Sequence, residues 1–186
     1  HCRPWIDTMT TPREYYRRYW DGRPIDRHDQ RTRQRVLQAH ALMKHTSGKL
    51  LDVGCGRGLS SSFFMEKGFD VLGLDFSDDA IDECKKRGIR VKRFDLEKDD
   101  LQGPYDVIVC IEVLEHLFDP LSALRKLKDA LANRGELIVT LPNEFHIVRR
   151  VEVLLGRQDF SRYDWHHLRF FDRRETERLH IDAGLR

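Results

Sequence analysis

The stretch Leu50-Leu51-Asp52-Val53-Gly54-Cys55-Gly56-Arg57-Gly58 decides the fold expected of this chain. A short apolar run ends in an acidic residue and then opens into three glycines at alternate positions, just ahead of a helix-like segment over 60–67. This order predicts a β-strand, a tight turn and the N-terminus of a helix. Because glycine lets a ligand lie against the main chain, the turn is predicted to be a ligand seat.

The spacing of these glycines narrows the kind of ligand. A dinucleotide-binding G-x-G-x-x-G motif that starts at Gly54 would need a glycine at position 59, where the chain has Leu59. The pyrophosphate of a dinucleotide is therefore disfavoured. An ordinary glycine-rich turn between a strand and a helix, with no ligand, is the alternative.

Strand-like and helix-like segments alternate from residue 49 to residue 141, which predicts a doubly wound parallel sheet. The expected strands are 49–53, 70–74, 89–94, 105–110 and 135–141. Besides 60–67, helices are expected over 79–87, from 119 to about 131, over 144–155 and over 172–183.

The residues before the first strand form a separate region in this interpretation. Residues 9–46 are expected to be an N-terminal helical cap, with one helix over 27–45, and residues 47–186 the ligand-binding domain. An aromatic, basic segment over 12–20 either covers the ligand pocket or simply packs on the domain. Residues 1–8 are taken as upstream sequence.

Acidic residues close the second and third predicted strands. Asp75, followed by Phe76, would lie across from the glycine turn, where its carboxylate can accept both ribose hydroxyls of a nucleoside. A helix cap is the alternative role for Asp75, but Ser77 already fills it. Asp95 and Leu96 close the third strand.

Taken together and in order, four segments resemble the motifs of class I S-adenosylmethionine (SAM) dependent methyltransferases: 51–58, 73–77, 94–96 and 106–117. The resemblance implies a Rossmann-like sheet of five parallel strands in the order 3-2-1-4-5 with helices on both faces. It implies SAM as cofactor and S-adenosylhomocysteine (SAH) as product. It places the methionine end of SAM at the acid and glycines of the turn and the adenine at the end of the third strand. The implied cofactor-binding residues are Asp52, Gly54, Cys55, Gly56, Asp75, Phe76, Asp95, Leu96 and Ile111.

Three later motifs resemble a narrower group. Residues 112–117, 141–143 and 167–171 are similar to the ubiquinone-biosynthesis O-methyltransferases and their small-molecule and glycan-modifying relatives, and 142–171 is also similar to the methionine-biosynthesis W protein. The family's sheet normally ends in an antiparallel hairpin that is missing from this chain. We therefore expect the fifth strand to have an exposed edge.

The candidate catalytic residues Glu112, Glu115 and His116 follow the fourth strand at spacings that one helical turn would bring to one side. In one interpretation His116 is the general base for an acceptor hydroxyl, helped by Glu112 or Glu115. In a second, these three and His167 bind Mg²⁺ or Mn²⁺, which would lower the pKa of the acceptor. That set resembles the metal ligands of small-RNA 3′-terminal 2′-O-methyltransferases. In a third, Glu112 touches the cofactor, Glu115 pairs with an arginine and His116 only packs.

The composition limits the function classes. With 33 basic and 31 acidic residues the net charge is only +2, so no global field favours nucleic acid, although arginines cluster over 13–35. The four cysteines lack C-x-x-C spacing, which favours reduced thiols in a cytoplasmic protein. No apolar run reaches the roughly 20 residues of a membrane span.

The resemblance implies transfer of the methyl group of SAM to an oxygen, with nitrogen less favoured, of a small molecule or a sugar. A metal-assisted methyltransferase of RNA 3′ ends and a non-catalytic SAM-binding partner protein in methionine biosynthesis are the alternatives. A monomer and a dimer both stay open.

Overall fold

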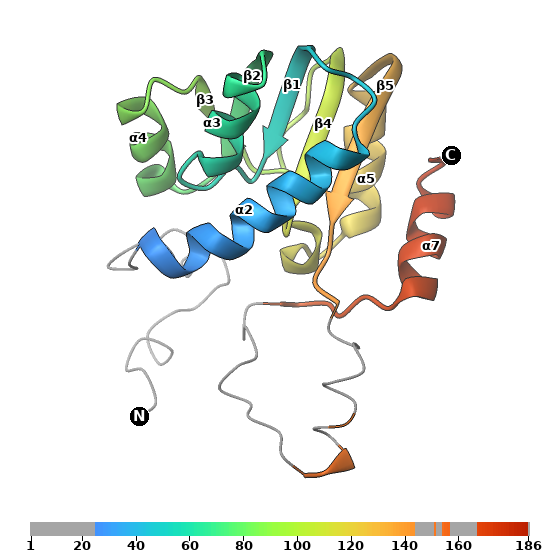
Figure 1. Cartoon of the computed structure of the whole chain (residues 1–186). Coiled ribbons are helices and arrows are strands. Elements are labelled where there is room, and N and C mark those ends of the chain that lie inside the picture. The colour runs from blue at the N-terminus through green and yellow to red at the C-terminus, as the bar shows by residue number, and fades with distance from the viewer. Residues whose placement is uncertain (1–24, 144–150, 152–153, 157–166, 186) are drawn as a thin grey trace.

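The structure, a computed structural model, describes residues 25–143, 151, 154–156 and 167–185. Its centre is a parallel sheet in the order β3-β2-β1-β4-β5 (Figure 1), which confirms the predicted topology. The strands are β1 (Gly48–Val53), β2 (Phe69–Asp75), β3 (Val91–Arg93), β4 (Tyr105–Ile111) and β5 (Leu131–Thr140).

The described helices lie close to the predicted bounds. They are α2 (Ile25–Leu42), α3 (Leu59–Glu66), α4 (Asp78–Lys86), α5 (Pro120–Asp129), α7 (Arg173–Asp182) and the short 3₁₀ helix η2 (Leu114–His116). Ser77 caps α4 as expected, and Asp172 and Glu175 form a capping box at the start of α7. The predicted segment 12–20 and nearly all of the predicted helix over 144–155 lie outside the described residues.

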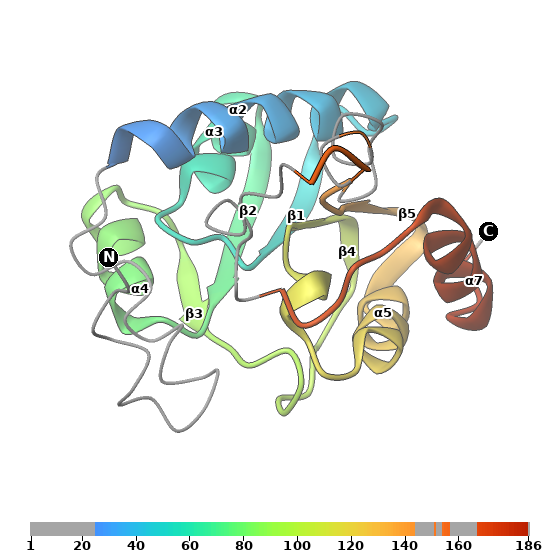
Figure 2. The same cartoon turned by 90° about the horizontal axis from the view of Figure 1, so that it is seen from below.

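The two faces of the sheet are covered by different helices, as Figure 2 shows from below. On one face Leu50, Val71 and Val107 pack with residues of α2 and α3. On the other face Leu51 and Ile108 pack with residues of α5. Residues 107–110 of β4 are all buried because this strand is covered from both sides.

Two strands differ from the prediction in length. β3 has only three residues instead of six, and β5 begins at Leu131 rather than 135. The longer β5 contains an irregularity in its pairing, because Tyr105 faces Leu131 but Val107 faces Glu136. Arg134 has a positive φ of 67° inside it. The polar residues 133 and 134, which precede the predicted start of the strand at 135, belong to a bulge within a continuous strand.

β5 is the outermost described strand on its side of the sheet, and β3 is outermost on the other. The expected open edge at the fifth strand thus agrees with the order of the described strands. Among the helices that the structure describes, none combines the length and the apolar character needed to cross a membrane.

Candidate active site

The glycine turn connects the end of β1 to α3 and is shaped by close neighbours. Gly54 and Gly58 both have a positive φ, 69° and 81°, which side chains rarely adopt. A Cβ on Gly54 would overlap Cγ2 of Val113, and one on Gly58 would overlap Cδ1 of Ile89. The turn thus needs glycine for its backbone angles and for its tight packing.

Asp75 lies across from this turn, as predicted. One oxygen of its carboxylate accepts a hydrogen bond from the backbone N–H of Gly56 at 2.9 Å, and the other accepts from the N–H of Ser77 at 2.9 Å. Burial raises the pKa of Asp75, and these two hydrogen bonds oppose the rise. The carboxylate is therefore held at the carboxyl ends of β1 and β2, with half-buried Phe76 next to it.

Asp52 is buried beneath the turn, and its predicted contact with the methionine end of SAM stays a prediction. Its side chain is only 1% exposed and accepts hydrogen bonds from the hydroxyls of Ser60 at 2.5 Å and Ser61 at 2.6 Å. Burial raises its pKa to about 6, although the serine hydroxyls oppose the rise. In this structure Asp52 therefore holds the first turn of α3 against β1. Sequence reasoning missed this role, for which the serines at 60–62 were the available signal.

The side chain of Cys55 also points into the protein. Its sulfur lies 3.9 Å from the sulfur of Cys84 on α4, and the thiol of Cys84 donates to the carbonyl of Gly56 at 3.2 Å. The contact with Cys84 and burial raise the pKa of the Cys55 thiol. Both cysteines are buried and reduced, and they support the turn from below.

The loop after β3 is fixed by hydrogen bonds to other elements. The N–H of Asp95 donates to the carboxylate of Asp99 at 2.8 Å, so Asp99 orders the loop. The carbonyl of buried Leu96 accepts from Nζ of Lys126 on α5 at 2.7 Å. Glu97 accepts from the N–H of Phe118 at 2.8 Å. These contacts fix Asp95 and Leu96 at the carboxyl edge of the sheet.

Ile111 ends β4, and Glu112 after it takes a positive φ of 54°, which is uncommon for a residue with a side chain. One carboxylate oxygen of Glu112 pairs with Arg35 of α2 at 2.7 Å, and the other accepts from the hydroxyl of Thr140 of β5 at 3.3 Å. Burial raises the pKa of Glu112, while Arg35 and Thr140 oppose the rise. Glu112 thus links the N-terminal helix to the sheet.

The prediction that one helical turn gathers Glu112, Glu115 and His116 is wrong for Glu112. Helical backbone begins only at Leu114, and the turn at Glu112 directs its side chain toward α2 and β5. Glu115, fully buried, and His116 instead meet His167 from the distal segment. One ligand atom from each of these three residues lies within 4.8 Å of the others. The rings of His116 and His167 have centroids 4.9 Å apart.

The segment that carries His167 is held on η2 by its next two residues. The N–H groups of Leu168 and Arg169 donate to the carbonyl of Glu115 at 2.8 and 3.2 Å. The guanidinium of Arg169 donates to the carbonyls of Leu117, at 3.3 Å, and Phe118. Arg169 is therefore a positioning residue for His167. Sequence reasoning missed it and Arg35, although Arg169 stands inside a quoted motif and Arg35 inside the basic segment 13–35.

One carboxylate and two imidazoles are a donor set that fits a divalent transition-metal ion. Mg²⁺ prefers an all-oxygen environment, whereas mixed oxygen and nitrogen ligands suit Mn²⁺ and later ions. The fit of these described residues is therefore better for Mn²⁺ than for Mg²⁺, and it involves three of the four predicted ligands.

Comparison with known proteins places this geometry in a family. A family model described as a methyltransferase domain matches residues 25–186. Over 118 residues the chain is 30% identical to the ubiquinone biosynthesis O-methyltransferase of Shewanella halifaxensis, covering 59% of this chain and 50% of that protein. Over 168 residues it is 29% identical to the protein of the same name from Psychrobacter arcticus, covering 80% and 63%. The chain therefore spans about half the length of the first of these relatives.

Solved structures agree on the fold. Magnesium protoporphyrin IX methyltransferase from Synechocystis, solved with bound SAH, superposes with a TM-score of 0.65 at 18% identity, covering 94% of this chain and 84% of that one. With the family model, the sheet order and the turn facing Asp75, these matches show that the chain belongs to the class I SAM-dependent methyltransferases.

Proposed function

We propose that this chain transfers the methyl group of SAM to an oxygen of a small-molecule or sugar acceptor. The observation that carries the proposal is the position of two groups at one edge of the sheet. The glycine turn facing Asp75 lies after β1 and β2, and the cluster of Glu115, His116 and His167 lies after β4. Ligands of open parallel sheets bind at this edge. The names of the curated relatives support oxygen as the acceptor atom.

The cofactor half of the site would work through binding and orientation. When bound, SAM supplies a methyl group that is activated by its attachment to a positively charged sulfur. Asp75 is placed to accept the ribose hydroxyls, and the backbone of 54–58 lets the ligand approach closely. Asp95 and Leu96 would hold the adenine. Asp52 and Cys55 would stabilise the conformation of the turn through their buried contacts.

The acceptor half would handle a proton. As the acceptor oxygen bonds to the methyl carbon, the carbon–sulfur bond breaks and the acceptor's proton must leave. His116 is 20% exposed at its side chain and lies next to a buried carboxylate, with Nε2 4.0 Å from Oε1 of Glu115. An imidazole so placed can take that proton, and the carboxylate stabilises the imidazolium that forms.

Metal-assisted transfer is the second candidate, because Glu115, His116 and His167 come within ligand distance of one another. A divalent ion held there would lower the pKa of the acceptor hydroxyl. Glu112 does not belong to this described cluster, and its carboxylate pairs with Arg35 instead. The four-ligand set on which the RNA 3′-end alternative rested is therefore not assembled among the described residues.

The test combines binding with turnover. Calorimetry with SAM and SAH measures the cofactor half, and release of SAH with phenols, sugars and amines as acceptors measures transfer. We expect binding of both ligands and turnover with hydroxyl acceptors. Binding without turnover toward any acceptor would favour the non-catalytic partner protein. Turnover with amines alone would contradict oxygen as the acceptor atom.

The metal is tested separately by titrating Mn²⁺ into chelator-treated protein and following the signal of free Mn²⁺ by electron paramagnetic resonance. We expect one bound ion that His167→Ala weakens by about 10- to 100-fold. His180→Ala is the matched control, because this histidine lies on α7 and contacts Thr176. Equal Mn²⁺ affinity in both variants would exclude the metal-assisted mechanism.

A further inference from the structure

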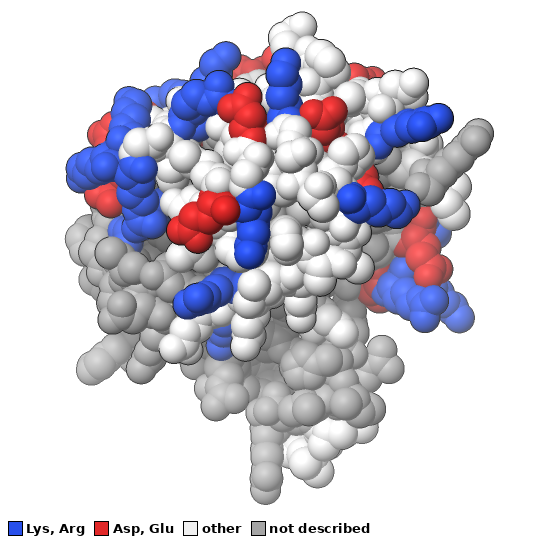
Figure 3. All heavy atoms as spheres, turned by 45° about the horizontal axis from the view of Figure 1, so that its top comes forward, with Lys and Arg blue, Asp and Glu red and all other residues white. Residues whose placement is uncertain are grey.

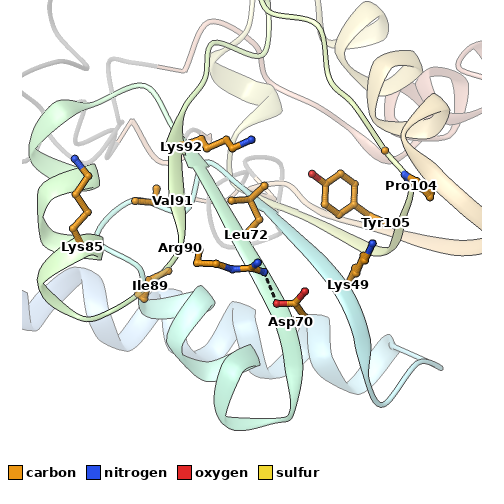
Figure 4. Close-up of a pocket in the computed structure, with 11 residues that line it drawn as sticks. Lys49, Asp70, Leu72, Lys85, Ile89, Arg90, Val91, Lys92, Pro104 and Tyr105 are labelled. Atoms are coloured by element: carbon orange, nitrogen blue, oxygen red, sulfur yellow. Dashed lines mark hydrogen bonds and ion pairs between the residues drawn. The ribbon is translucent and has the colours of Figure 1, made fainter.

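A pocket of about 600 Å³ lies away from the candidate active site (Figure 4). Lys49, Asp70 and Tyr105 stand at or near the amino ends of β1, β2 and β4, whereas the cofactor and acceptor groups lie at the carboxyl ends. The pocket therefore belongs to a part of the sheet that the proposed reaction does not use. Its lining residues are Lys49, Asp70, Leu72, Lys85, Ile89, Arg90, Val91, Lys92, Gly103, Pro104 and Tyr105.

The pocket exists because one face of the sheet is covered only in part. Lys49 shares the face of Leu51, and Asp70 and Leu72 share the face of Leu74, because side chains alternate along a strand. This is the face that α5 covers beside β4 and β5 (Figure 2). The described chain between β3 and β4 contains no helix, so the amino half of β2 is left open there.

The lining combines positive charge with an apolar floor. Four basic residues face a single acid, Asp70, which is paired with Arg90. Lys85 forms an ion pair with Asp82, which lies three residues earlier on α4, at 3.5 Å. Lys49 and Lys92 have no ion-pair partner among the residues that the structure describes. Two ammonium groups are thus available for an anion.

Tyr105 adds a neutral donor to the lysines. Burial raises the pKa of its hydroxyl, which keeps the proton on the oxygen, and within the described residues this hydroxyl has no hydrogen-bond partner. Figure 4 shows the hydroxyl of Tyr105 and the ammonium of Lys92 directed toward the part of the pocket where Leu72 lies. The groups available to a ligand are therefore hydrogen-bond donors placed around an apolar surface.

Protection of an edge strand does not explain all of the hydrogen-bond donors in the pocket lining. Lysines on an outermost strand prevent unwanted pairing with other chains, which accounts for Lys92 on β3. Lys49 and Tyr105 lie on β1 and β4, which are inner strands with neighbours on both sides. Figure 3, in which the amino ends of the strands come forward, shows Lys and Arg on the side of α4 and β3 and also on the opposite side.

We propose that this pocket binds a small organic phosphate, a phosphorylated molecule with an apolar or aromatic body. The charge and the three oxygens of a phosphate group suit two ammonium groups and a phenol hydroxyl. An apolar body would cover Leu72 and the ring of Tyr105. The volume lies within the range of small-molecule sites, about 300–1,000 Å³. The lining contains one aromatic side chain, Tyr105. This disfavours single-stranded RNA as the ligand, because proteins that bind it stack its bases on several aromatic side chains.

The test uses phenyl phosphate, titrated by calorimetry into the SAH-saturated protein at low salt. Lys49→Gln combined with Lys92→Gln should weaken binding about tenfold or more. Lys128→Gln, a single charge change on α5, should leave the affinity within about twofold. Inorganic phosphate should bind several-fold more weakly than phenyl phosphate, because it cannot cover the apolar floor.

Nuclear magnetic resonance locates the ligand. The methyl signals of Leu72 and Val91 should shift on addition of phenyl phosphate, and those of Val53 at the opposite strand ends should not. Unshifted Leu72 signals, or equal weakening by Lys128→Gln, would overturn the proposal. Tighter binding of a single-stranded RNA oligonucleotide through the same two lysines would also overturn it, in favour of a nucleic-acid surface.

Discussion

The two halves of the candidate active site are built in different ways. The cofactor half uses regular elements, because the turn at 54–58 directly follows β1 and Asp75 is the last residue of β2. The acceptor half uses a single 3₁₀ turn and a segment some fifty residues later, held together by hydrogen bonds from Leu168 and Arg169. We expect the cofactor half to tolerate little change and the acceptor half to be adjustable.

The largest effect is expected for a substitution of Gly54, which should disrupt only the cofactor half of the site. Gly54→Ala should weaken SAM binding by about 100-fold or more, because a Cβ there overlaps Val113 and disfavours the positive φ. Gly88→Ala is the matched control. Gly88 has a similar φ of 70°, and a Cβ added there would meet nothing within 4 Å. The affinity of the Gly88→Ala variant for SAM should therefore stay within about twofold of wild type. Equal losses in calorimetry would show that strain alone, and not the site, is responsible.

The next effect separates the acceptor half from the cofactor half. His116→Ala should lower turnover by about 100-fold, because the proton acceptor is lost, while the dissociation constant of SAM changes less than about twofold. Stopped assays of SAH release and calorimetry on the same preparation measure the two quantities. A matching loss of SAM affinity would mean that the halves are not independent.

A smaller effect is expected at Arg169, which acts only through position. Arg169→Ala should lower turnover and Mn²⁺ affinity by about 3- to 10-fold, because the segment carrying His167 loses two side-chain hydrogen bonds to the residues that directly follow η2. Arg169→Lys should restore part of the loss, and the imidazole signals of His167 should broaden in the alanine variant. Unchanged imidazole signals would assign Arg169 a role in general stability instead.

The last prediction concerns stability, not binding or turnover, and involves the buried acid below the turn. The pKa of Asp52 rises on folding from 3.8 to about 6, so the stabilisation linked to its protonation is complete below pH 3.8 and is lost as pH rises through about 6. Asp52→Asn keeps an acceptor for the two serines and removes the buried charge. Relative to wild type, its free energy of unfolding should increase by about 3 kcal/mol between pH 3.5 and pH 7.5. Urea denaturation at both pH values measures this, and a constant difference would contradict the buried charge.

The difference between the cofactor half and the acceptor half also explains which features could be predicted from the sequence. The alternation of strands and helices and the place of Asp75 at a strand end follow from local patterns, because strands, turns and helix caps depend on neighbouring residues. The strand order was predicted only from the family resemblance. The positive φ at Glu112 and the bulge near Arg134 depend on contacts between distant elements, and single-sequence patterns do not carry those. The spacing of Glu112, Glu115 and His116 suggested one helical face, but the chain turns before the helix begins.

Asp52 shows the same limit inside a strong motif. The motif located the acid correctly beside the turn, yet the side chain faces Ser60 and Ser61 within the protein. The direction of a side chain at a strand end depends on the helix that packs above it. The position of Asp52 near the end of β1 was therefore predictable from the sequence, and the direction of its side chain was not.

The central claim is that the turn facing Asp75 seats SAM, and calorimetric titration of SAH into wild type and Asp75→Asn tests it most directly. The account predicts one binding site in wild type with a dissociation constant in the micromolar range, weakened by about tenfold or more in the variant, which loses the charge at the ribose. Absence of heat with SAH and with SAM in the folded wild-type protein, or equal affinity in both proteins, would contradict it.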